Sequence, residues 1–404
     1  MSTSLIYHAF SIVGYTYRCQ HFQSGSTIVG IEQPRDRLRC AHCRSQNVWK
    51  DGSTERVFRS LPIGKRPTFF ALEIPRLRCH DCGTVRQAKV GFADPKKHYT
   101  RAFARYALEL SQLTTIQDAA NHLDVGWDTI KDIQANYLQK KFGKPKLRNL
   151  KEIAIDEICI GKGHKYLTIV LDLLTGAVVF VGEGKGADSL EIFWKRVRRA
   201  HAKIKAVATD MSSAYIKAVR DNLKKAVHVF DHFHVIKLFN EKLSNFRRAL
   251  FNQAESDAER RVLKGTRWLL LKNPENLDEE RNEWARLKEA LRLNKPLAIA
   301  YYLKEDLRQI WLQPNKATAR RVLKDWLARA RASKIGMLVR FANTLEEHQE
   351  GVLNYYDYRI STGPLEGTNN KIKTMNRQAY GFRDPEFFKL KILGIHETKH
   401  ALVG

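Results

Sequence analysis

The chain has 404 residues, of which 43% are hydrophobic, so it is long enough for two or three globular domains and too apolar to be a disordered tail. It carries 70 Lys and Arg residues against 43 Asp and Glu residues, a formal net charge of +27. A charge of this size repels itself unless a polyanion shares it, which indicates a nucleic-acid partner. A basic protein that is merely soluble is the alternative.

A membrane is the other anionic partner to consider. The sequence contains no run of about 18 apolar residues, the length needed to cross a bilayer. Residues 1–12 lack the charged start and the long apolar stretch of a secretory signal. We therefore expect no membrane partner and a cytoplasmic location, where thiols stay reduced and disulfides are not expected.

The first segment, residues 1–95, is predicted to form a small module of short strands. Residues 57–61 and 69–74 have the composition of strands, and the second run is predicted to end at Pro75. A boundary is expected at residues 95–97, where Pro precedes two lysines.

Two Cys-x-x-Cys pairs lie in this module and predict a structural zinc site. Each pair can place two thiolates on one ion, and two pairs complete the tetrahedral shell that Zn²⁺ prefers. Two pairs of free or redox-active thiols are the alternative. Arginine and lysine residues flank both pairs, so the module is expected to contact phosphates. The four predicted ligands are Cys40, Cys43, Cys79 and Cys82.

Residues 96–142 are predicted to form a helix-turn-helix that binds DNA, followed by a basic linker. Residues 115–123 and 128–133 fit its two helices, with Gly126 in the tight connection. A three-helix bundle that does not touch DNA is the alternative. Asp132 is also predicted to face outward, either to read a cytosine amino group or to be solvated. The candidate DNA-binding residues of the second helix are Trp127, Thr129 and Lys131.

An α/β domain is predicted to begin near residue 143, with a first part at residues 143–238. Three successive strands form an antiparallel meander, and strands then alternate with helices. Residues 239–345 have a helical pattern without strands and are predicted to be a helical insertion, and residues 346–404 return to the α/β domain. The predicted strands are residues 152–160, 166–173, 177–181, 206–209 and 227–230.

Three carboxylates on these elements are the candidate catalytic residues. Asp156 lies within the first strand, Asp210 directly follows the strand at 206–209, and Glu366 lies in the first turn of a late helix. If they meet, they can hold two divalent cations for phosphoryl transfer, with Mg²⁺ or Mn²⁺ as the expected ions. Three ordinary surface acids are the alternative.

Two further groups flank these candidates. On the late helix, Asn370, Lys373 and Arg377 share a face with Glu366 and are predicted to meet DNA phosphates. Asp231 and His234 follow the last strand and are predicted to contact the substrate strand or to orient a ligand. A helix cap at Asp231 with incidental histidines is an equal alternative for that pair.

These motifs together resemble those of bacterial insertion-sequence transposases of the ISL3 family. The resemblance covers nearly the whole chain and is carried by the cysteine pairs, the helix-turn-helix and three motifs, at residues 154–157, 231–234 and 361–367. It implies an RNase H-like catalytic core with a helical insertion between the second aspartate and the glutamate. It also implies the catalytic triad Asp156, Asp210 and Glu366, with Asp231 and His234 as an auxiliary motif.

The expected function is therefore that of a DNA transposase. It would bind the inverted repeats at the ends of its element, cut the DNA to a free 3′-hydroxyl and join that end to a target duplex. A homodimer or a higher oligomer at the bacterial nucleoid is expected, because both ends must be held together. A DNA-binding regulator with an inactive fold and a structure-specific nuclease that cannot join ends are the alternatives.

Overall fold

The computed structural model describes residues 4–161, 163 and 165–396, which divide into two compact units. Unit 1 ends at Gly143 and unit 2 begins at Lys144. The division falls in the basic linker at residues 140–148, where Gly143 and Pro145 interrupt the helical pattern. The boundary between the two units therefore lies where the helical pattern of the sequence ends.

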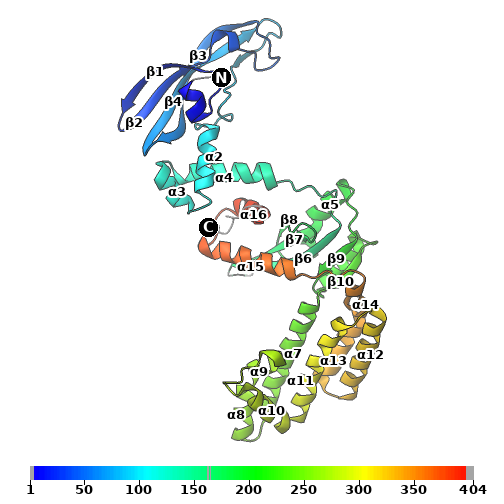
Figure 1. The fold of residues 1–404 in the computed structure, drawn as a ribbon. Coiled ribbons are helices and arrows are strands. Elements are labelled where there is room, and N and C mark those ends of the chain that lie inside the picture. Colours follow the sequence, from blue (N-terminus) through cyan, green and yellow to red (C-terminus); the bar gives the residue numbers. More distant parts are fainter. Residues whose placement is uncertain (1–3, 162, 164, 397–404) are drawn as a thin grey trace. The chain divides into compact units, whose positions relative to one another are not determined.

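Unit 1 begins with a five-stranded sheet (Figure 1). Its strand order is β1-β2-β4-β3, with β5 paired to β4, and only the β2–β4 pair is parallel. Edge-to-face aromatic pairs fill its core, with ring centroids of Phe10 and Phe70 5.1 Å apart and those of Phe58 and Phe92 5.2 Å apart. The elements are α1 (Leu5–Phe10), β1 (Thr16–Gln23), β2 (Ser26–Glu32), η1 (Arg35–Arg37), β3 (Val48–Ile63), β4 (Arg66–Cys79) and β5 (Val85–Gln87).

The β3–β4 hairpin is much longer than the sequence predicts. The predicted strands at 57–61 and 69–74 are only its central parts, and β4 continues through Pro75 to Cys79. The prediction that Pro75 ends the strand is wrong because the register of β3 shifts between Lys50 and Ser53, next to Pro75. A bulge of this kind tolerates a residue without an N–H group.

Three helices, α2 (Arg101–Leu110), α3 (Ile116–Leu123) and α4 (Trp127–Phe142), complete unit 1 as a helix-turn-helix. Ala119 and Ala120 are fully buried, so α3 and α4 can approach closely. Gly126 is the N-cap of α4 and has an ordinary negative φ. The left-handed residue of the turn is Asp124, whose φ is 49°.

Unit 2 contains the second five-stranded sheet, in the order β10-β9-β6-β7-β8. β6, β7 and β8 form an antiparallel meander, and β9 and β10 run parallel to β6. All five strands lie where the sequence predicts them, because each is a short apolar run bounded by turn residues. They are β6 (Glu152–Gly161), β7 (Lys165–Asp172), β8 (Val178–Glu183), β9 (Ala206–Thr209) and β10 (Val227–Phe230).

Helices pack on both faces of this sheet (Figure 1). Ile153 and Ile155 of β6 pack in one hydrophobic cluster with the apolar side chains of α5 and α6. Alternate residues of β6 face the other way, where α15 lies against the strand. The helices of the two layers are η2 (Ala187–Leu190), α5 (Glu191–Arg199), α6 (Ser213–Asn222), α15 (Gly363–Gln378) and α16 (Pro385–Leu393).

The helical insertion begins directly after β10. Its first helix is continuous through Phe239, the predicted start of the insertion, so the helical run already begins at His232. Trp326 lies at its centre, fully buried, and donates from Nε1 to the carbonyl of Leu303 at 2.7 Å. The elements are α7 (His232–Gln253), α8 (Asp257–Gly265), α9 (Arg267–Leu271), η3 (Pro274–Asn276), α10 (Glu283–Leu293), α11 (Lys295–Arg308), η4 (Gln309–Leu312), α12 (Lys316–Ala332), α13 (Gly336–Glu347), α14 (Gln349–Leu353) and η5 (Asn354–Tyr356).

The end of the insertion returns to the strand from which the insertion starts. Asn354 donates from Nδ2 to the carbonyl of His228 on β10 at 2.9 Å. Gly351 of α14 lies so close to Phe230 that a Cβ at this position would overlap the ring. The insertion is therefore anchored on β10 at both of its ends. Among the described residues, no helix is long and apolar enough to span a membrane.

We predict that Gly351→Ala destabilises unit 2 because the new methyl group meets a packed ring. Overpacking of this kind typically costs about 1–3 kcal/mol. Gly367→Ala is the matched control, since Gly367 is exposed on α15 and a Cβ added there would meet nothing within 4 Å. Removing an exposed helical glycine is expected to stabilise by about 0.5–1 kcal/mol. Urea unfolding of the full chain measures both, and equal shifts would contradict the tight α14–β10 contact.

Candidate active site and zinc centre

The four predicted cysteine ligands come together in unit 1. Their Sγ atoms all lie within 4.8 Å of one another, with Cys40 3.6 Å from Cys82 and Cys43 3.5 Å from Cys79. Sulfurs at the corners of a tetrahedron with Zn–S bonds of about 2.3 Å are roughly 3.8 Å apart. A disulfide needs sulfurs about 2.0 Å apart, so these thiols are not bonded to each other. The arrangement fits a closed zinc site.

Two equivalent turns present these sulfurs. In each Cys-x-x-Cys turn the residue after the second cysteine donates its N–H to the first cysteine's carbonyl at 3.0 Å. Those residues, Arg44 and Gly83, both have a positive φ. Asp81 ties the two turns together, because its carboxylate accepts hydrogen bonds from Ser45 and from Nδ2 of Asn47.

The surroundings of Cys40 and Cys43 shift the pKa values of these two thiols. The backbone N–H groups of Cys43 and His42 lower the pKa of the Cys40 thiol to about 5. At Cys43 the N–H of Ser45 acts in the same direction, but burial beside the other thiols outweighs it and raises the pKa to about 12. Four thiolates at this distance repel one another unless a cation joins them, and a thiolate is the form that binds zinc.

In unit 2, three aspartates follow one edge of the catalytic sheet. Asp156 lies on β6, two residues beyond the last β6–β9 pair, and Asp210 directly follows β9. Asp231 directly follows β10. Because these strands are parallel, their carboxyl ends meet at the same edge, and helices α6 and α7 begin there as well. The positive ends of those helices favour negative charge at this edge.

Asp156 is held on the face of the sheet that α15 covers. Its Oδ2 accepts a hydrogen bond from Nδ2 of Asn369 at 2.9 Å, and its Oδ1 accepts one from the N–H of Glu157 at 2.8 Å. Burial raises the pKa of Asp156, and the carboxylate of Asp210 adds to that rise. The N–H of Glu157 and the charge of His234 act against it. Asp156, Asp210 and His234 are therefore close enough to interact electrostatically.

Asp231 is almost completely buried, with 2% of its surface exposed. It caps α7, since its Oδ1 accepts from the N–H of Phe233 at 3.4 Å. Its Oδ2 accepts a hydrogen bond from the hydroxyl of Thr362, the N-cap residue of α15. The contacts of Asp231 are therefore those of a helix cap, one of its two predicted roles. Its hydrogen bond with Thr362 fixes the start of α15, the helix that carries Glu366.

Glu366 lies between two anchors on α15. Thr362 precedes it by four residues and Asn369 follows it by three, so all three lie on neighbouring positions of one helix face. Glu366 is exposed at the rim of this face, whereas Thr362 and Asn369 are buried. Glu366 therefore lies on the helix that these two anchors bind to the aspartate edge. Among the described residues, only the cysteines are gathered as a tight metal-binding cluster, and the three carboxylates are not.

Asn369 and Thr362 are site residues that sequence reasoning missed. The helical spacing groups the neighbouring Asn370 with Lys373 and Arg377 on the face of Glu366. The sequence therefore predicts Asn370 as a site residue and not Asn369. Those three side chains are all exposed on α15, as predicted. The signal for Asn369 was available, because a residue three positions after Glu366 lies on the next turn of the same helix.

The predicted DNA-facing residues of α4 lie in its first two turns. Trp127 is 54% exposed, the ammonium group of Lys131 lies 5.8 Å from its ring centroid, and Thr129 is half-buried. Asp132 is half-buried, and of its two predicted roles the structure disfavours base reading. Its carboxylate accepts hydrogen bonds from Nζ of Lys97 at 2.7 Å and from the hydroxyl of Tyr99 at 2.9 Å, so it is not free to read a base.

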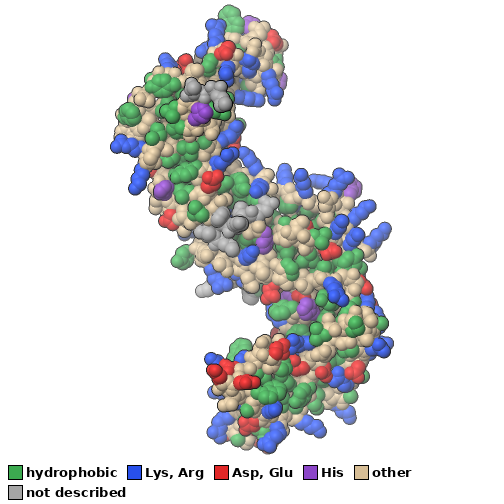
Figure 2. All heavy atoms as spheres, viewed as in Figure 1, with side chains coloured by type: hydrophobic (Ala, Val, Ile, Leu, Met, Phe, Trp, Pro, Cys, Tyr) green, Lys and Arg blue, Asp and Glu red, His purple; other side chains and the backbone are tan. Residues whose placement is uncertain are grey.

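Positive charge also gathers on part of the surface of unit 2. Figure 2 shows Lys and Arg side chains gathered over α5, which contributes Lys195, Arg198 and Arg199. A surface of this sign attracts a polyanion and steers it toward the protein.

Three family models match successive parts of the chain. A zinc-finger model of transposases IS204, IS1001, IS1096 and IS1165 matches residues 36–82. A helix-turn-helix domain model of transposase family ISL3 matches residues 88–138, and a model of that family described as a transposase matches residues 153–392.

Individual relatives agree with these matches. The transposase for insertion sequence element IS1001 of Bordetella parapertussis is 33% identical over 358 residues, 88% of both chains. The transposase for element IS1557 of Mycobacterium tuberculosis is 29% identical over 391 residues, 90% of this chain and 87% of the relative. A chain of the solved Drosophila P element transposase strand transfer complex is similar in structure, with a TM-score of 0.36 and 13% sequence identity. The matched region covers 74% of the present chain and 92% of the Drosophila chain.

We predict that the cysteine cluster holds about one zinc ion per chain and that unit 1 depends on it. Cys79→Ser is expected to lower the zinc content well below one and to unfold unit 1, because metal binding and folding of such sites are coupled. Elemental analysis and circular dichroism measure the two effects. Cys159→Ser is the matched control, since Cys159 is exposed and lies outside the cluster. Full zinc content in Cys79→Ser would refute the assignment.

We predict that Thr362→Val destabilises unit 2, whereas Thr362→Ser does not. Valine keeps the shape but removes the donor to a buried carboxylate, which typically costs about 1–3 kcal/mol. Serine keeps the hydroxyl group. Thermal unfolding of the two variants compares them directly, and equal midpoints would show that the bond to Asp231 contributes nothing.

Proposed function

The chain belongs to the ISL3 family of insertion-sequence transposases, and we propose that it cleaves and joins DNA with Asp156, Asp210 and Glu366 as its catalytic residues. The observation that supports this assignment is the docking of α15. Asn369 and Thr362 bind the aspartate edge on either side of Glu366, so the helix that carries the glutamate is fixed to the strands that carry the aspartates.

The donor set at this edge fits a hard divalent cation. It consists of carboxylate oxygens together with Oδ1 of Asn369, a buried oxygen without a hydrogen-bond partner. Mg²⁺ and Mn²⁺ prefer oxygen ligands of this kind. When bound, such ions activate the attacking hydroxyl group and stabilise the leaving oxygen. Asp156, Asp210 and Glu366 are the residues that would hold them, and a cation would offset the burial that raises the pKa of Asp156.

The neighbouring residues prepare the site without touching the reacting atoms. Asp231 is a positioning residue, because its carboxylate is committed to the cap of α7 and to Thr362. The positive charge of His234 helps to keep Asp156 ionised. On the exposed face of α15, Asn370, Lys373 and Arg377 would bind the phosphates that flank the cleaved bond.

The remaining parts would bring the substrate to this site. Trp127, Thr129 and Lys131 of α4 would contact the terminal repeat of the element, assisted by the basic zinc module. Two ends must be held for strand transfer, so we propose that at least two protomers act together at the nucleoid. The DNA substrate is double-stranded, both as transposon end and as target.

We predict that purified protein with Mg²⁺ or Mn²⁺ cuts and joins duplexes that carry the ends of its own element. Loss of even an outer partner of a metal site costs roughly 10–100-fold. Asp156→Asn, Asp210→Asn and Glu366→Gln are therefore each expected to lose more than about 100-fold in cleavage while a gel shift shows unchanged DNA binding.

Glu152→Gln is the matched control for that experiment, because Glu152 is the first residue of the strand that carries Asp156 and lies four positions before it. It is expected to leave cleavage unchanged. Cleavage that survives in the three carboxylate variants would remove the assigned site. Specific binding without cleavage in either metal would identify the chain as a DNA-binding regulator, and cleavage without joining would identify it as a nuclease.

A further inference from the structure

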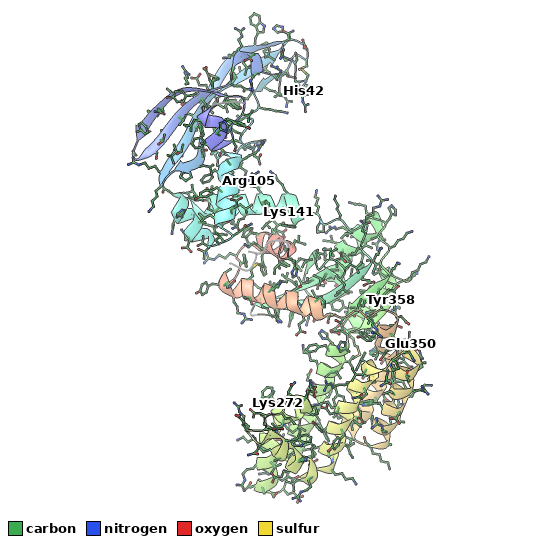
Figure 3. The ribbon with its side chains drawn as sticks, in the orientation of Figure 1. His42, Arg105, Lys141, Lys272, Glu350 and Tyr358 are labelled. Carbon is green, nitrogen blue, oxygen red and sulfur yellow. The ribbon has the colours of Figure 1, made fainter. Side chains whose placement is uncertain are left out.

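The long β3–β4 hairpin of unit 1 connects the zinc centre to the helix-turn-helix. At one end Val48 pairs with Cys79, a cysteine of the cluster. Toward the other end Arg59 pairs with Phe69, where the hairpin meets the helices. In Figure 3, His42 of the first cysteine turn lies at the end of the sheet away from Arg105 of α2. The two DNA-contacting parts of unit 1 are thus joined by one continuous structure.

The length of this connection matches a repeat of DNA. β3 carries an extra residue at its bulge, so β4 gives the better measure, and Cys79 lies ten positions after Phe69 along that strand. A strand rises about 3.3 Å per residue, which gives a span of about 33 Å. One turn of B-DNA is about 34–36 Å long. The hairpin therefore separates the cysteine turns from the Arg59–Phe69 pair, where it meets the helices, by about one helical turn.

The junction at the helical end is fixed by Arg59. Its side chain is 7% exposed and lies between two rings, 5.1 Å from the centroid of Phe69 and 5.4 Å from that of Phe103 on α2. Its Nη2 donates to the carbonyl of Leu123 at 2.8 Å. Leu123 is the last residue of α3, directly before the turn of the helix-turn-helix. A buried guanidinium group thus binds the hairpin to that turn.

Further polar contacts extend this connection to the recognition helix. The backbone of Arg59 pairs with residues 98–100, accepting from the N–H of Thr100 and donating to the carbonyl of His98, both at 2.8 Å. The adjoining Lys97 and Tyr99 bind Asp132 of α4. The recognition helix is therefore linked to β3 through a chain of hydrogen bonds.

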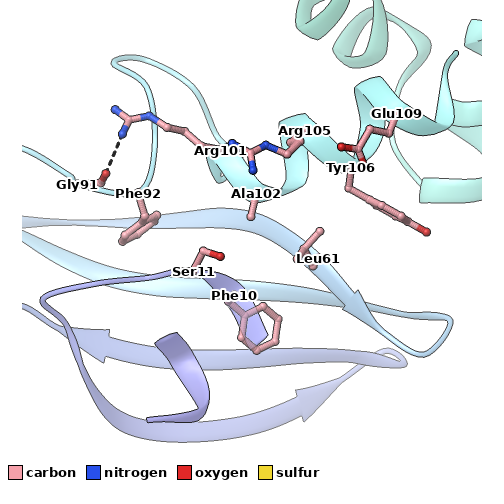
Figure 4. A pocket seen from close by; sticks show the side chains of 10 residues that line it. All are labelled: Phe10, Ser11, Leu61, Gly91, Phe92, Arg101, Ala102, Arg105, Tyr106 and Glu109. Carbon is pink, nitrogen blue, oxygen red and sulfur yellow. Dashed lines mark hydrogen bonds between the residues drawn. The ribbon is translucent and has the colours of Figure 1, made fainter. Parts of the chain in front are cut away.

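Packing alone does not make this junction rigid. A cavity of about 360 Å³ opens between α2 and the sheet, lined by Phe10, Leu61, Phe92 and Tyr106 among others (Figure 4). Arg101 crosses its rim and donates from Nη1 to the carbonyl of Gly91 at 3.0 Å. Because the apolar contact is incomplete here, the polar links determine how the helices sit on the sheet.

We propose that unit 1 is a rigid reader of two DNA blocks, in which the β3–β4 hairpin sets their separation at about one helical turn. The cysteine turns contact one block and the first turns of α4 contact the other. Arg59 is the positioning residue that fixes the spacing. The inference rests on the proposed function, because it specifies how the transposase recognises the ends of its element.

The first test uses the full-length protein and a duplex selected from a random pool by that protein. Footprinting is expected to show two protected blocks with centres about 10–11 base pairs apart. Inserting about 5 base pairs between them turns one block to the opposite side of the duplex. Affinity is then expected to fall roughly 30-fold or more, since loss of a block removes several base contacts.

The second test compares spacing tolerance between variants. Arg59→Met removes the guanidinium contacts, and Arg18→Met, on the exposed edge strand β1, removes the same charge elsewhere on the sheet. Insertion of one or two base pairs is expected to weaken binding by the wild type and by Arg18→Met to the same degree. For Arg59→Met, the ratio of the affinity for the selected duplex to the affinity for the duplex with inserted base pairs is expected to approach one. In this variant the cysteine turns and the helices are no longer held at a fixed separation.

A single protected block, or wild-type affinity that does not depend on spacing, would overturn the proposal. If Arg59→Met does not fold, the wild-type spacing series still decides the question. The tests measure binding alone, so they also separate this inference from the proposed function. Two spaced blocks on a protein that never cleaves DNA would contradict the catalytic proposal only.

Discussion

The hydrogen bond from Asn369 to Asp156 joins two residues 213 positions apart, and the arrangement of the candidate active site depends on it. Helix α15 has an exposed face, so apolar packing alone leaves its rotation about its own axis weakly defined. The amide of Asn369 binds a carboxylate that lies on one face of β6, and Asn376 of the same helix donates to the carbonyl of Ile160 on that strand at 2.9 Å. Together these contacts select one rotation of α15. Hydrogen bonds to charged groups are among the stronger ones, at about 1.5–3 kcal/mol.

A second anchor places the same helix relative to the insertion. Thr362 binds Asp231, and Asp231 also caps α7, the first helix of the insertion. The insertion ends on the same strand, where Asn354 binds the carbonyl of His228 and Gly351 meets Phe230. The start of the insertion, its end and the glutamate helix therefore share β10 as a common support. A long helical segment can be inserted at this point because its start follows β10 and its end packs against the same strand.

Unit 1 is stabilised in a different way from unit 2. The outer part of its hairpin is too exposed to be held by a hydrophobic core, with Trp49 67% exposed near the cysteine turns. The four cysteines gathered there could hold a zinc ion, which would replace the missing core, as small modules commonly require. At the inner end, the buried Arg59 adds a hydrogen bond to Leu123 beside the aromatic core of Phe58 and Phe70. Polar groups with defined geometry thus contribute at both ends of the hairpin, which suits a structure whose proposed function is to hold a distance.

The sequence by itself determined the class of the protein, the cysteine ligands, the order of the parts and all five strands of the catalytic sheet. These features are encoded locally, in ligand spacing and in short apolar runs bounded by turns. Tertiary structure decided the length of the β3–β4 hairpin, the partner of Asp132 and the choice of Asn369 over Asn370 as the partner of Asp156. Strand length there depends on cross-strand pairing rather than on an apolar pattern, and Asp132 is neutralised by Lys97, a residue of another segment. The choice between two adjacent asparagines depends on how a helix is rotated against a distant strand, and no local pattern of residues contains that information.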